Sequence, residues 1–331
     1  MAAPDRLPFE AVLAALKAAG EATRLRILAL LGQAELTVKD LTAILGQSQP
    51  RISRHLKLLA EAGLIDRYPE GAWVFYRLTD QPAARRFADA LFAQMDAADA
   101  ALARDRERLA GVKEYHALAA RRYFAENAAE WDSIRALHVV EGAVETAMVD
   151  AVGARPFDSL LDLGTGTGRL LELFAPRYAR AVGIDASAAM LAVARANLDR
   201  AGIANAQVRL GDIQHLPFAR NSFDVVTIHQ VLHYLDDPER AVAEAARVLR
   251  PGGRLLVVDF APHDLEFLRE RHAHRRLGFA QQAVRQWIEG PGLALEEAHD
   301  LPAGSGKLTV TLWIARDRRI AVAGDAGREV A

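Results

Sequence analysis

Residues 160–168 read Leu-Leu-Asp-Leu-Gly-Thr-Gly-Thr-Gly, and this stretch decides the fold of the C-terminal half of the chain. The apolar run 159–163 predicts a buried parallel strand, and the glycines that follow let the backbone turn tightly and approach a ligand closely. A second apolar run, 181–184, places Asp185 at its C-terminal end, where a carboxylate can accept hydrogen bonds from both hydroxyls of a ribose. We therefore expect this half to bind an adenosine-containing molecule.

Strand-like and helical segments alternate after residue 156, which predicts a doubly wound parallel sheet of the α/β class, similar to a Rossmann fold. The expected strands are the apolar runs 159–163, 181–184, 207–210, 224–228 and 254–259. The expected helices between them include 169–174, 186–201 and 238–249. Two later runs, 293–300 and 307–315, are expected to finish a seven-stranded sheet as a hairpin pair.

The bulk composition limits the classes of protein to consider. The 331 residues suffice for about two domains of ~150 residues each. Lys plus Arg is 41 and Asp plus Glu is 43, a net charge of −2, so DNA binding would depend on a local basic surface. The absence of cysteine excludes disulfides, thiolate metal sites and a cysteine nucleophile. Neither a signal peptide nor a membrane span is recognisable, so we expect a cytoplasmic protein.

The first 80 residues predict a helix-turn-helix followed by a β-hairpin. Four helices are expected, at 9–19, 23–31, 38–45 and from Pro50 to about 62, with a turn at 47–49 before the last one. The strand-like runs 64–68 and 73–78 flank a turn and form the hairpin. This order of elements is typical of a winged helix-turn-helix domain.

The second helix of the pair carries a basic face, because Arg51, Arg54 and Lys57 are spaced by three residues. Such a helix can lie in the major groove of DNA, with basic side chains on phosphates and polar side chains on base edges. A solvated surface explains a charge run equally well, so the pattern alone leaves both interpretations open. The candidate DNA-contacting residues are Ser48, Gln49, Arg51, Ser53, Arg54, His55 and Lys57, with Arg67 and Arg77 from the hairpin.

Three segments in this region, 22–28, 47–57 and 58–65, resemble the ArsR/SmtB-type family of winged helix-turn-helix repressors over about residues 10–100. The resemblance implies a homodimer that binds double-stranded operator DNA. It also implies a dimer interface built from the first helix and a helix expected at 82–110. That helix would bury an apolar stripe formed by Phe87, Leu91, Met95, Ala98, Leu102 and Leu109.

One departure from the family pattern concerns the signal that the protein would sense. Many members bind metalloids through two cysteines, and the corresponding positions here hold Thr37 and Lys39. No histidine lies between His55 and His116, so the carboxylate-and-histidine zinc site of other members is missing as well. We expect no metal, and the signal must come from another part of the chain.

Three features of the second half resemble class I S-adenosylmethionine-dependent methyltransferases, over about residues 120–315. Asp162 directly precedes glycines that are two apart, whereas a dinucleotide fingerprint has two spacers before its third glycine. Gly211-Asp212-Ile213 follows the third strand, and the stretches 217–226 and 246–256 match the family. The resemblance implies cofactor contacts from Asp162, Gly164, Thr165, Gly166, Gly168, Asp185, Ala186, Met190, Gly211, Asp212, Ile213, His229, Gln230, Tyr123 and Trp131.

In the family pattern these residues have separate roles. Asp162 and the glycine loop lie along the methionine part, Asp185 binds the ribose, and Asp212 binds the adenine amine. Ile213 packs on the adenine ring, His229 and Gln230 lie beside the sulfonium, and Tyr123 with Trp131 belongs to a lid. His229 and His233 are candidate bases, although a histidine near a strand end is often structural. The Asn/Asp-Pro-Pro-Tyr segment of nucleic-acid amino methyltransferases is absent after Val226, which disfavours that substrate class.

The expected domains are 1–110 for DNA binding and dimerisation, 111–150 for a helical linker or lid, 151–316 for the methyltransferase-like part, and 317–331 for a loose tail. Three hypotheses join them. The first is a transcriptional regulator that uses S-adenosylmethionine or S-adenosylhomocysteine as effector. The second is an active methyltransferase with a small-molecule methyl acceptor and an autoregulatory DNA-binding domain. In the third, the winged helix serves only for dimerisation.

Overall fold

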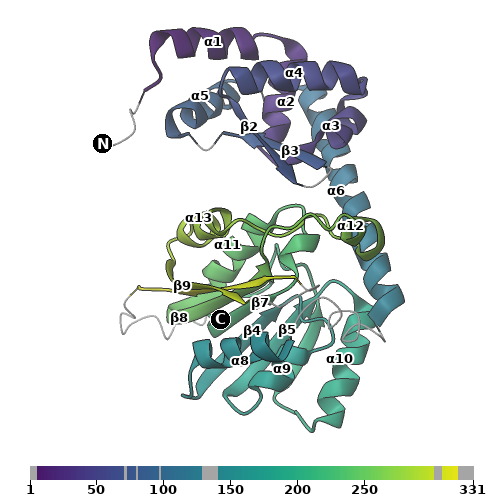
Figure 1. Ribbon diagram of the computed structural model, residues 1–331, viewed down its shortest axis with the longest axis vertical. Coiled ribbons are helices and arrows are strands. Elements are labelled where there is room, and N and C mark those ends of the chain that lie inside the picture. Colours follow the sequence, from purple (N-terminus) through teal and green to yellow (C-terminus); the bar gives the residue numbers. More distant parts are fainter. Residues whose placement is uncertain are drawn as a thin grey trace, which may run out of the picture. The chain divides into compact units, whose positions relative to one another are not determined.

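The computed structural model describes residues 6–70, 73–79, 81–96, 98–128, 141–301 and 308–319. The chain divides into two compact units, Met1–Leu118 and Ala119–Ala331, which are shown in Figure 1. Among the residues described, no helix combines the length and the apolar character that crossing a membrane requires.

The N-terminal unit begins as the sequence predicts, with helices α1 (Phe9–Ala19), α2 (Ala22–Leu31), α3 (Val38–Leu45) and α4 (Gln49–Glu61). Strands β1 (Leu36–Thr37), β2 (Ile65–Glu70) and β3 (Trp73–Leu78) form an antiparallel sheet in the order β1-β3-β2. The turn of the helix-turn-helix is shorter than expected, because α4 already starts at Gln49. The fully buried core includes Ile27, Leu28, Leu41, Ile44, Ile52 and Leu56.

A capping box starts α3. The backbone N–H of Asp40 donates to Oγ1 of Thr37 at 3.2 Å, and the backbone N–H of Thr37 donates to Oδ2 of Asp40 at 3.0 Å. Both residues are buried, so these bonds satisfy two donors at the helix start that water would not reach. The Thr37 position is therefore part of the scaffold of the helix-turn-helix.

The prediction of a single helix at 82–110 is wrong. The structure has two helices there, α5 (Pro82–Ala93) and α6 (Ala100–Asn127). The side chain of Asp99 explains the break, because its Oδ1 accepts from the N–H groups of Ala101 and Leu102 at 2.8 and 3.1 Å and so starts a new helix. Part of the expected apolar stripe packs within its own unit, where Phe87, Leu91 and Leu109 join the N-terminal core.

The C-terminal unit confirms the doubly wound sheet, with seven strands in the order β6-β5-β4-β7-β8-β10-β9. Strands β4 to β8 run parallel to one another, and β10 runs antiparallel to both β8 and β9. The strands are β4 (Phe157–Leu163), β5 (Tyr178–Asp185), β6 (Ala206–Leu210), β7 (Phe223–His229), β8 (Leu249–Phe260), β9 (Ala294–Leu301) and β10 (Val310–Arg316).

Helices cover both faces of this sheet (Figure 1). Helices α11 (Pro238–Val248) and α13 (Gln281–Glu289) pack on one face, and α8 (Glu141–Val152) and α9 (Arg169–Phe174) pack on the other. The remaining elements of the unit are α10 (Ala188–Arg200), the 3₁₀ turn η2 (Leu232–Tyr234) and α12 (Phe267–His272). After β10, Asp317 is buried and exchanges backbone hydrogen bonds with Gly252 and Gly253.

The strand order reverses beside β4, because the chain moves outward through β5 and β6 and then returns to place β7 on the other side of β4. Open α/β sheets bind ligands at the carboxyl ends of the strands at such a point. The glycine loop after β4 therefore lies on one side of the expected ligand site. His229, which ends β7, and Gln230, which follows it, lie on the other side.

Candidate functional site

The glycine loop that follows β4 has a conformation that only glycines adopt easily. Gly164, Gly166 and Gly168 have φ angles of 71°, 53° and 85°, in the left-handed region. The N–H groups of Gly164 and Thr165 both donate to the carbonyl oxygen of Ile184, at 2.8 and 3.0 Å. A Cβ atom at Gly164 would lie 2.6 Å from Cγ2 of Val231, so close packing also excludes a side chain there.

Asp185, at the end of β5, reaches back to this loop. Its Oδ2 accepts from the N–H of Gly166 at 2.9 Å, and its Oδ1 accepts from the N–H of Ser187 at 2.8 Å. Burial raises the pKa of the Asp185 carboxyl, and the backbone N–H groups of Ser187 and Gly166 oppose that rise. Of its expected neighbours, Ala186 is exposed and Met190 is buried. The carboxylate is thus fixed in place, with lone pairs remaining for a ligand.

Two buried polar atoms beside the loop have no hydrogen-bond partner in the described part of the chain: Oγ1 of Thr165 and Nε2 of Gln230. Each residue is only 6% exposed. Gln230 also has a φ of 53°, which is uncommon for a residue with a side chain, and its N–H donates to Val258 at 2.7 Å. A buried donor without a partner costs about 1–3 kcal/mol, and a polar ligand at this edge would remove that cost.

Asp162 is a buried carboxylate inside the sheet, 2% exposed, opposite Thr227 in the register of β4 and β7. Its Oδ1 accepts from Oγ1 of Thr227 at 2.7 Å. Burial, and after it the negative charge of Asp162, raise the pKa of Tyr178 to about 12. A negative charge at this depth favours a cationic group of a ligand nearby, such as an ammonium.

The loop after β6 places the Asp212 side chain in solvent. Its Oδ1 accepts from the N–H of Gln214, and its Oδ2 lies 2.8 Å from Nδ1 of His215. Gly211 donates to the carbonyl oxygen of Asp185 at 3.0 Å, which ties the loop to the end of β5. Ile213 is buried in the core of the unit.

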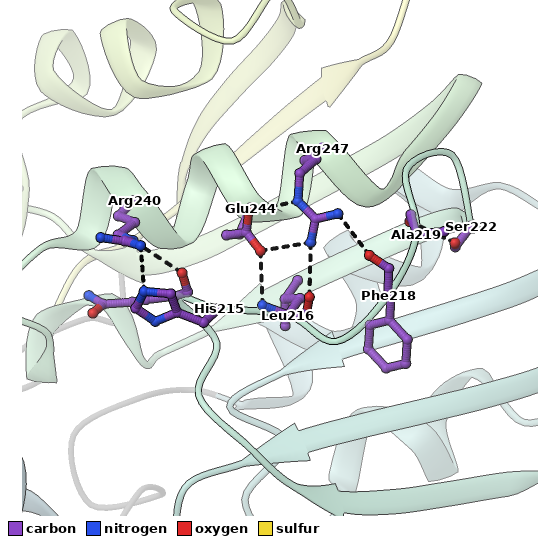
Figure 2. Close-up of polar contacts among 9 residues, drawn as sticks. His215, Leu216, Phe218, Ala219, Ser222, Arg240, Glu244 and Arg247 are labelled. Atoms are coloured by element: carbon purple, nitrogen blue, oxygen red, sulfur yellow. Dashed lines mark hydrogen bonds and ion pairs between the residues drawn. The ribbon is translucent and has the colours of Figure 1, made fainter.

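Helix α11 holds the same loop through hydrogen bonds from its charged side chains to the backbone of the loop (Figure 2). Glu244 accepts from the N–H of Leu216 at 2.9 Å, while Arg247 donates to the carbonyl oxygens of Phe218 and Leu216 at 2.7 and 3.0 Å. The hydrogen bond from Arg247 lowers the pKa of Glu244. Arg240 reaches the carbonyl oxygen of Gln214 at 3.2 Å. These contacts fix the path of the loop that carries Asp212.

His233, in the turn η2 that follows β7, and Asp259, near the end of β8, form a buried pair. Nδ1 of His233 lies 2.7 Å from Oδ1 of Asp259, and Oδ2 of Asp259 accepts from the N–H of Leu232 at 3.0 Å. Sequence reasoning selected His233 but missed Asp259. A carboxylate at the end of the apolar run 255–258 was a signal that could have identified it. His229 ends β7 and is half-buried.

The end of α6 contributes Tyr123, whose hydroxyl lies 2.6 Å from Nδ1 of His272. Burial raises the pKa of Tyr123. The neighbouring Phe124 packs edge-on against Tyr234, with ring centroids 4.7 Å apart. Trp131, the other residue expected in a lid, lies outside the described residues.

The candidate DNA-contacting residues divide into two groups. The first group is exposed to solvent and consists of Ser48, Gln49, Arg51, Ser53, Arg54, Lys57 and Arg67. The second group turns toward its own unit. The side chain of His55 is 12% exposed, lies 3.6 Å from the Glu21 carboxylate, and has its pKa lowered by burial. Arg77 lies 3.7 Å from Glu35.

Family models match both units. Residues 21–67 match the arsR family of bacterial regulatory proteins, and residues 161–257 match a methyltransferase domain. The uncharacterized methyltransferase YcgJ of Bacillus subtilis is 35% identical over 125 residues, which cover 38% of this chain and 49% of YcgJ. The ubiquinone/menaquinone biosynthesis C-methyltransferase UbiE of Teredinibacter turnerae is 36% identical over 182 residues, which cover 51% of this chain and 64% of UbiE.

One solved structure of similar fold is a chain from the complex between the Haloferax volcanii Trm112 methyltransferase activator and a methyltransferase. The two chains have a TM-score of 0.52 and are 22% identical, and the match covers 61% of this chain and 99% of that one. The chain spans about half the length of the first curated relatives it matches. The sequence matches and the geometry of both units agree on one conclusion. The chain joins an arsR-family helix-turn-helix region to a methyltransferase domain.

Proposed function

We propose that this protein is a transcriptional regulator that binds operator DNA through α4 and binds S-adenosylmethionine or S-adenosylhomocysteine at the strand ends of its methyltransferase domain. The exposed basic face of Arg51, Arg54 and Lys57 supports the first part. The glycine loop and Asp185 support the second. Both ligands and chromosomal DNA occur in the bacterial cytoplasm, which is the location we propose.

The ligand site follows from the groups at the switch point of the sheet. Asp185 would bind the ribose hydroxyls, while Thr165 and Gln230 would donate to the carboxylate of the methionine part. Asp162 would favour its ammonium group. Asp212, which keeps lone pairs beyond those used by Gln214 and His215, would bind the adenine amine. When bound, S-adenosylmethionine supplies a methyl group on a positively charged sulfur, whereas S-adenosylhomocysteine lacks both the methyl group and the charge.

The observation that carries the regulator proposal is the single helix α6. Near its start, Asp105 accepts two hydrogen bonds of 2.6 Å from Arg26 of α2, and Arg108 donates to the carbonyl oxygen of Ile44 in α3. Near its end, Tyr123 contacts His272 and Phe124 contacts Tyr234, close to the buried His233. Each set of contacts lies within its own unit, and one continuous helix joins them. A ligand that changes the second set can therefore act on the first.

We also propose a homodimer whose interface includes α1. Phe9 and Leu16 stand seven residues apart on this helix and are 78% and 49% exposed. A spacing of seven residues places both side chains on one helix face, and a second copy of the chain would cover it. Two recognition helices in a dimer would read two half-sites about one turn of DNA apart.

A second candidate function, an active small-molecule methyltransferase with an autoregulatory DNA-binding region, rests on the buried His233–Asp259 pair. An imidazole held by a carboxylate has the arrangement of a general base. Some relatives are methyltransferases of quinone biosynthesis by name, which supports a small-molecule acceptor over a nucleic acid.

The experiment is to measure binding of the full chain to DNA from upstream of its own gene, titrated separately with each of the two ligands. We expect one of them to change the DNA affinity by tenfold or more, about 1.4 kcal/mol. Asp185→Asn should abolish the response while DNA still binds without ligand. Asp199→Asn, an exposed carboxylate on α10, is the matched control. Tight DNA binding that neither ligand alters would reject the effector role in favour of the enzyme.

A further inference from the structure

His233 is held both through its imidazole and through its backbone carbonyl. Its Nδ1 is 2.7 Å from Asp259, and its carbonyl oxygen accepts from the N–H groups of both Arg275 and Arg276, at 2.8 and 3.0 Å. Asp259 is held in turn, because the N–H groups of Leu232 and Phe260 donate to its two oxygens at 3.0 and 2.8 Å. The imidazole therefore has one orientation.

These contacts determine which ring nitrogen carries the proton. An ionised carboxylate only accepts hydrogen bonds, so Nδ1 of the neutral His233 ring carries the hydrogen and donates it to Asp259. The lone pair is then on Nε2. That atom is buried, and no described residue hydrogen-bonds to it, although His233 as a whole is only 1% exposed. A ligand that offers a hydrogen-bond donor would pair this buried acceptor.

Aromatic rings pack against the His233 imidazole and indicate the shape of the ligand. The His233 ring centroid lies 4.1 Å from that of Tyr234, 4.2 Å from His274 and 4.9 Å from Phe260. Phe124 continues the cluster beyond Tyr234. Burial raises the pKa of Tyr234 well above its usual value, so its hydroxyl stays neutral. Aromatic walls of this kind suit a flat, apolar ring.

We propose that Nε2 of His233 binds and deprotonates the hydroxyl group of a phenolic methyl acceptor, with Asp259 as the residue that positions the imidazole. The proposal rests on the second candidate function above. In the step itself, the O–H bond of the acceptor breaks and an Nε2–H bond forms. The electron pair stays on the oxygen, which becomes a phenolate, and Asp259 stabilises the imidazolium through Nδ1–H.

The strength of the base selects the class of acceptor. Imidazole has a pKa of about 6.5 and a phenol such as tyrosine has about 10, a gap small enough for proton transfer during catalysis. The hydroxyl of an aliphatic alcohol is far less acidic, so proton transfer to imidazole is less favourable for it than for a phenol. A second imidazole, His263, stands near Phe260 with its Nε2 also buried and without a partner among the described residues. Its Nδ1 accepts from the N–H of Leu265 at 3.3 Å, so Nε2 of the neutral ring carries the hydrogen and would donate to a second oxygen on the acceptor ring.

The test uses the full chain and 4-nitrophenol, a phenol that ionises near neutral pH and absorbs visible light only as the phenolate. Titrations are run with and without S-adenosylhomocysteine on the wild type, His233→Gln and Asp259→Asn. His299→Gln is the control, because His299 is an exposed histidine that pairs only with Glu297 among the contacts described. Nitrogen NMR of the imidazole rings reports directly which nitrogen of His233 carries the proton.

We expect the wild type and His299→Gln to bind 4-nitrophenol with a phenolate band, and His233→Gln to bind it at least tenfold more weakly and without the band. In the wild type without ligand, Nε2 of His233 should carry no proton, and it should gain one when 4-nitrophenol binds. In Asp259→Asn the preference between the two nitrogens should be lost. The NMR measurement needs no variant of His233, so misfolding of His233→Gln does not prevent a decision.

Two results would overturn the proposal: a proton on Nε2 in the unliganded wild type, or equal affinity for 4-nitrophenol in the wild type and His233→Gln. Calorimetric titration of the same proteins with S-adenosylhomocysteine separates the two levels of inference. If the nucleoside binds and the phenol does not, the phenol proposal fails while the ligand site stands. If the nucleoside does not bind, the proposed function fails, and the phenol and NMR arms still decide the role of His233.

Discussion

The two candidate binding surfaces of this chain place their polar groups in opposite environments. On α4, Arg51, Arg54 and Lys57 are exposed and belong to a helix whose other face supplies Ile52 and Leu56 to the core. At the strand ends of the C-terminal sheet, Thr165 and Gln230 are buried and lack partners among the described residues. A phosphate backbone can be met by charges in water, whereas a small ligand is held by groups already removed from water.

The difference predicts how the two surfaces respond to substitution. Exposed groups on α4 should affect binding and leave the folding free energy nearly unchanged. Buried groups around the glycine loop should affect both at once, because they also form part of the packing. The following substitutions test this contrast, in order of decreasing effect.

The largest effect on the free energy of unfolding should come from Arg26→Ala. This variant tests whether the loss of stability depends on burial of the affected group or on the unit in which the group lies. Arg26 makes a bidentate ion pair with Asp105, whose side chain is 3% exposed, so its loss leaves a buried carboxylate alone. We expect the free energy of unfolding to fall by about 3 kcal/mol. Urea denaturation followed by circular dichroism measures it. Arg104→Ala removes an exposed arginine of α6, the helix that carries Asp105, and should change the free energy of unfolding by less than about 0.5 kcal/mol. A similar value for both variants would contradict the prediction.

Gly164→Ala should lower the free energy of unfolding by about 2 kcal/mol and also weaken ligand binding. The new Cβ would meet Val231 at 2.6 Å in a backbone conformation with φ of 71°. Adding Val231→Ala removes the clash but not the backbone strain, so it should restore part of the loss. Denaturation and calorimetric titration with S-adenosylhomocysteine measure the two effects. If the second substitution restores nothing, close packing is not the reason for this glycine.

The double variant Arg51→Ala with Arg54→Ala should weaken DNA binding and leave the stability of the fold nearly unchanged. We expect DNA affinity to fall by tenfold or more and the salt dependence of binding to decrease by about two counterions per protomer, while the free energy of unfolding changes by less than about 0.5 kcal/mol. Fluorescence anisotropy with labelled DNA at several salt concentrations gives both binding quantities. Unchanged DNA affinity would favour a winged helix that serves only for dimerisation.

The smallest effect concerns acid stability. Burial, and after it the nearby His233, lower the pKa of His263 from 6.5 to about 4, so the folded state holds this imidazole neutral. The stabilisation is complete above pH 6.5 and is lost as the pH falls from 6.5 toward 4, because the unfolded chain then binds the proton more readily. His263→Gln should flatten the fall in melting temperature over this range. His299→Gln should leave its slope unchanged.

Most of the fold could be predicted from patterns of residues that are close together in the sequence. The glycine loop, the strand runs and Asp185 could be predicted because each depends on neighbours in the sequence, and strand ends of a parallel sheet meet at one edge. The break between α5 and α6 was missed because the Ala-rich segment masks the capping signal of Asp99.

Contacts between distant segments could not be read in the same way. Asp259 meets His233 only because β7 and β8 are adjacent in register, which no spacing reveals. The direction of Asp212 toward His215 depends on how α11 holds the loop, through Glu244 and Arg247.

The capping box at the start of α3 has a consequence for metal binding at this position. In the family pattern, position 37 is one of two cysteines that bind metalloids, whereas here Thr37 starts a helix in partnership with the buried Asp40. A thiolate pair at positions 37 and 39 would remove this cap, at about 1 kcal/mol, before a bound metal could add any stability. A metalloid site at these positions would therefore compete with the start of the helix.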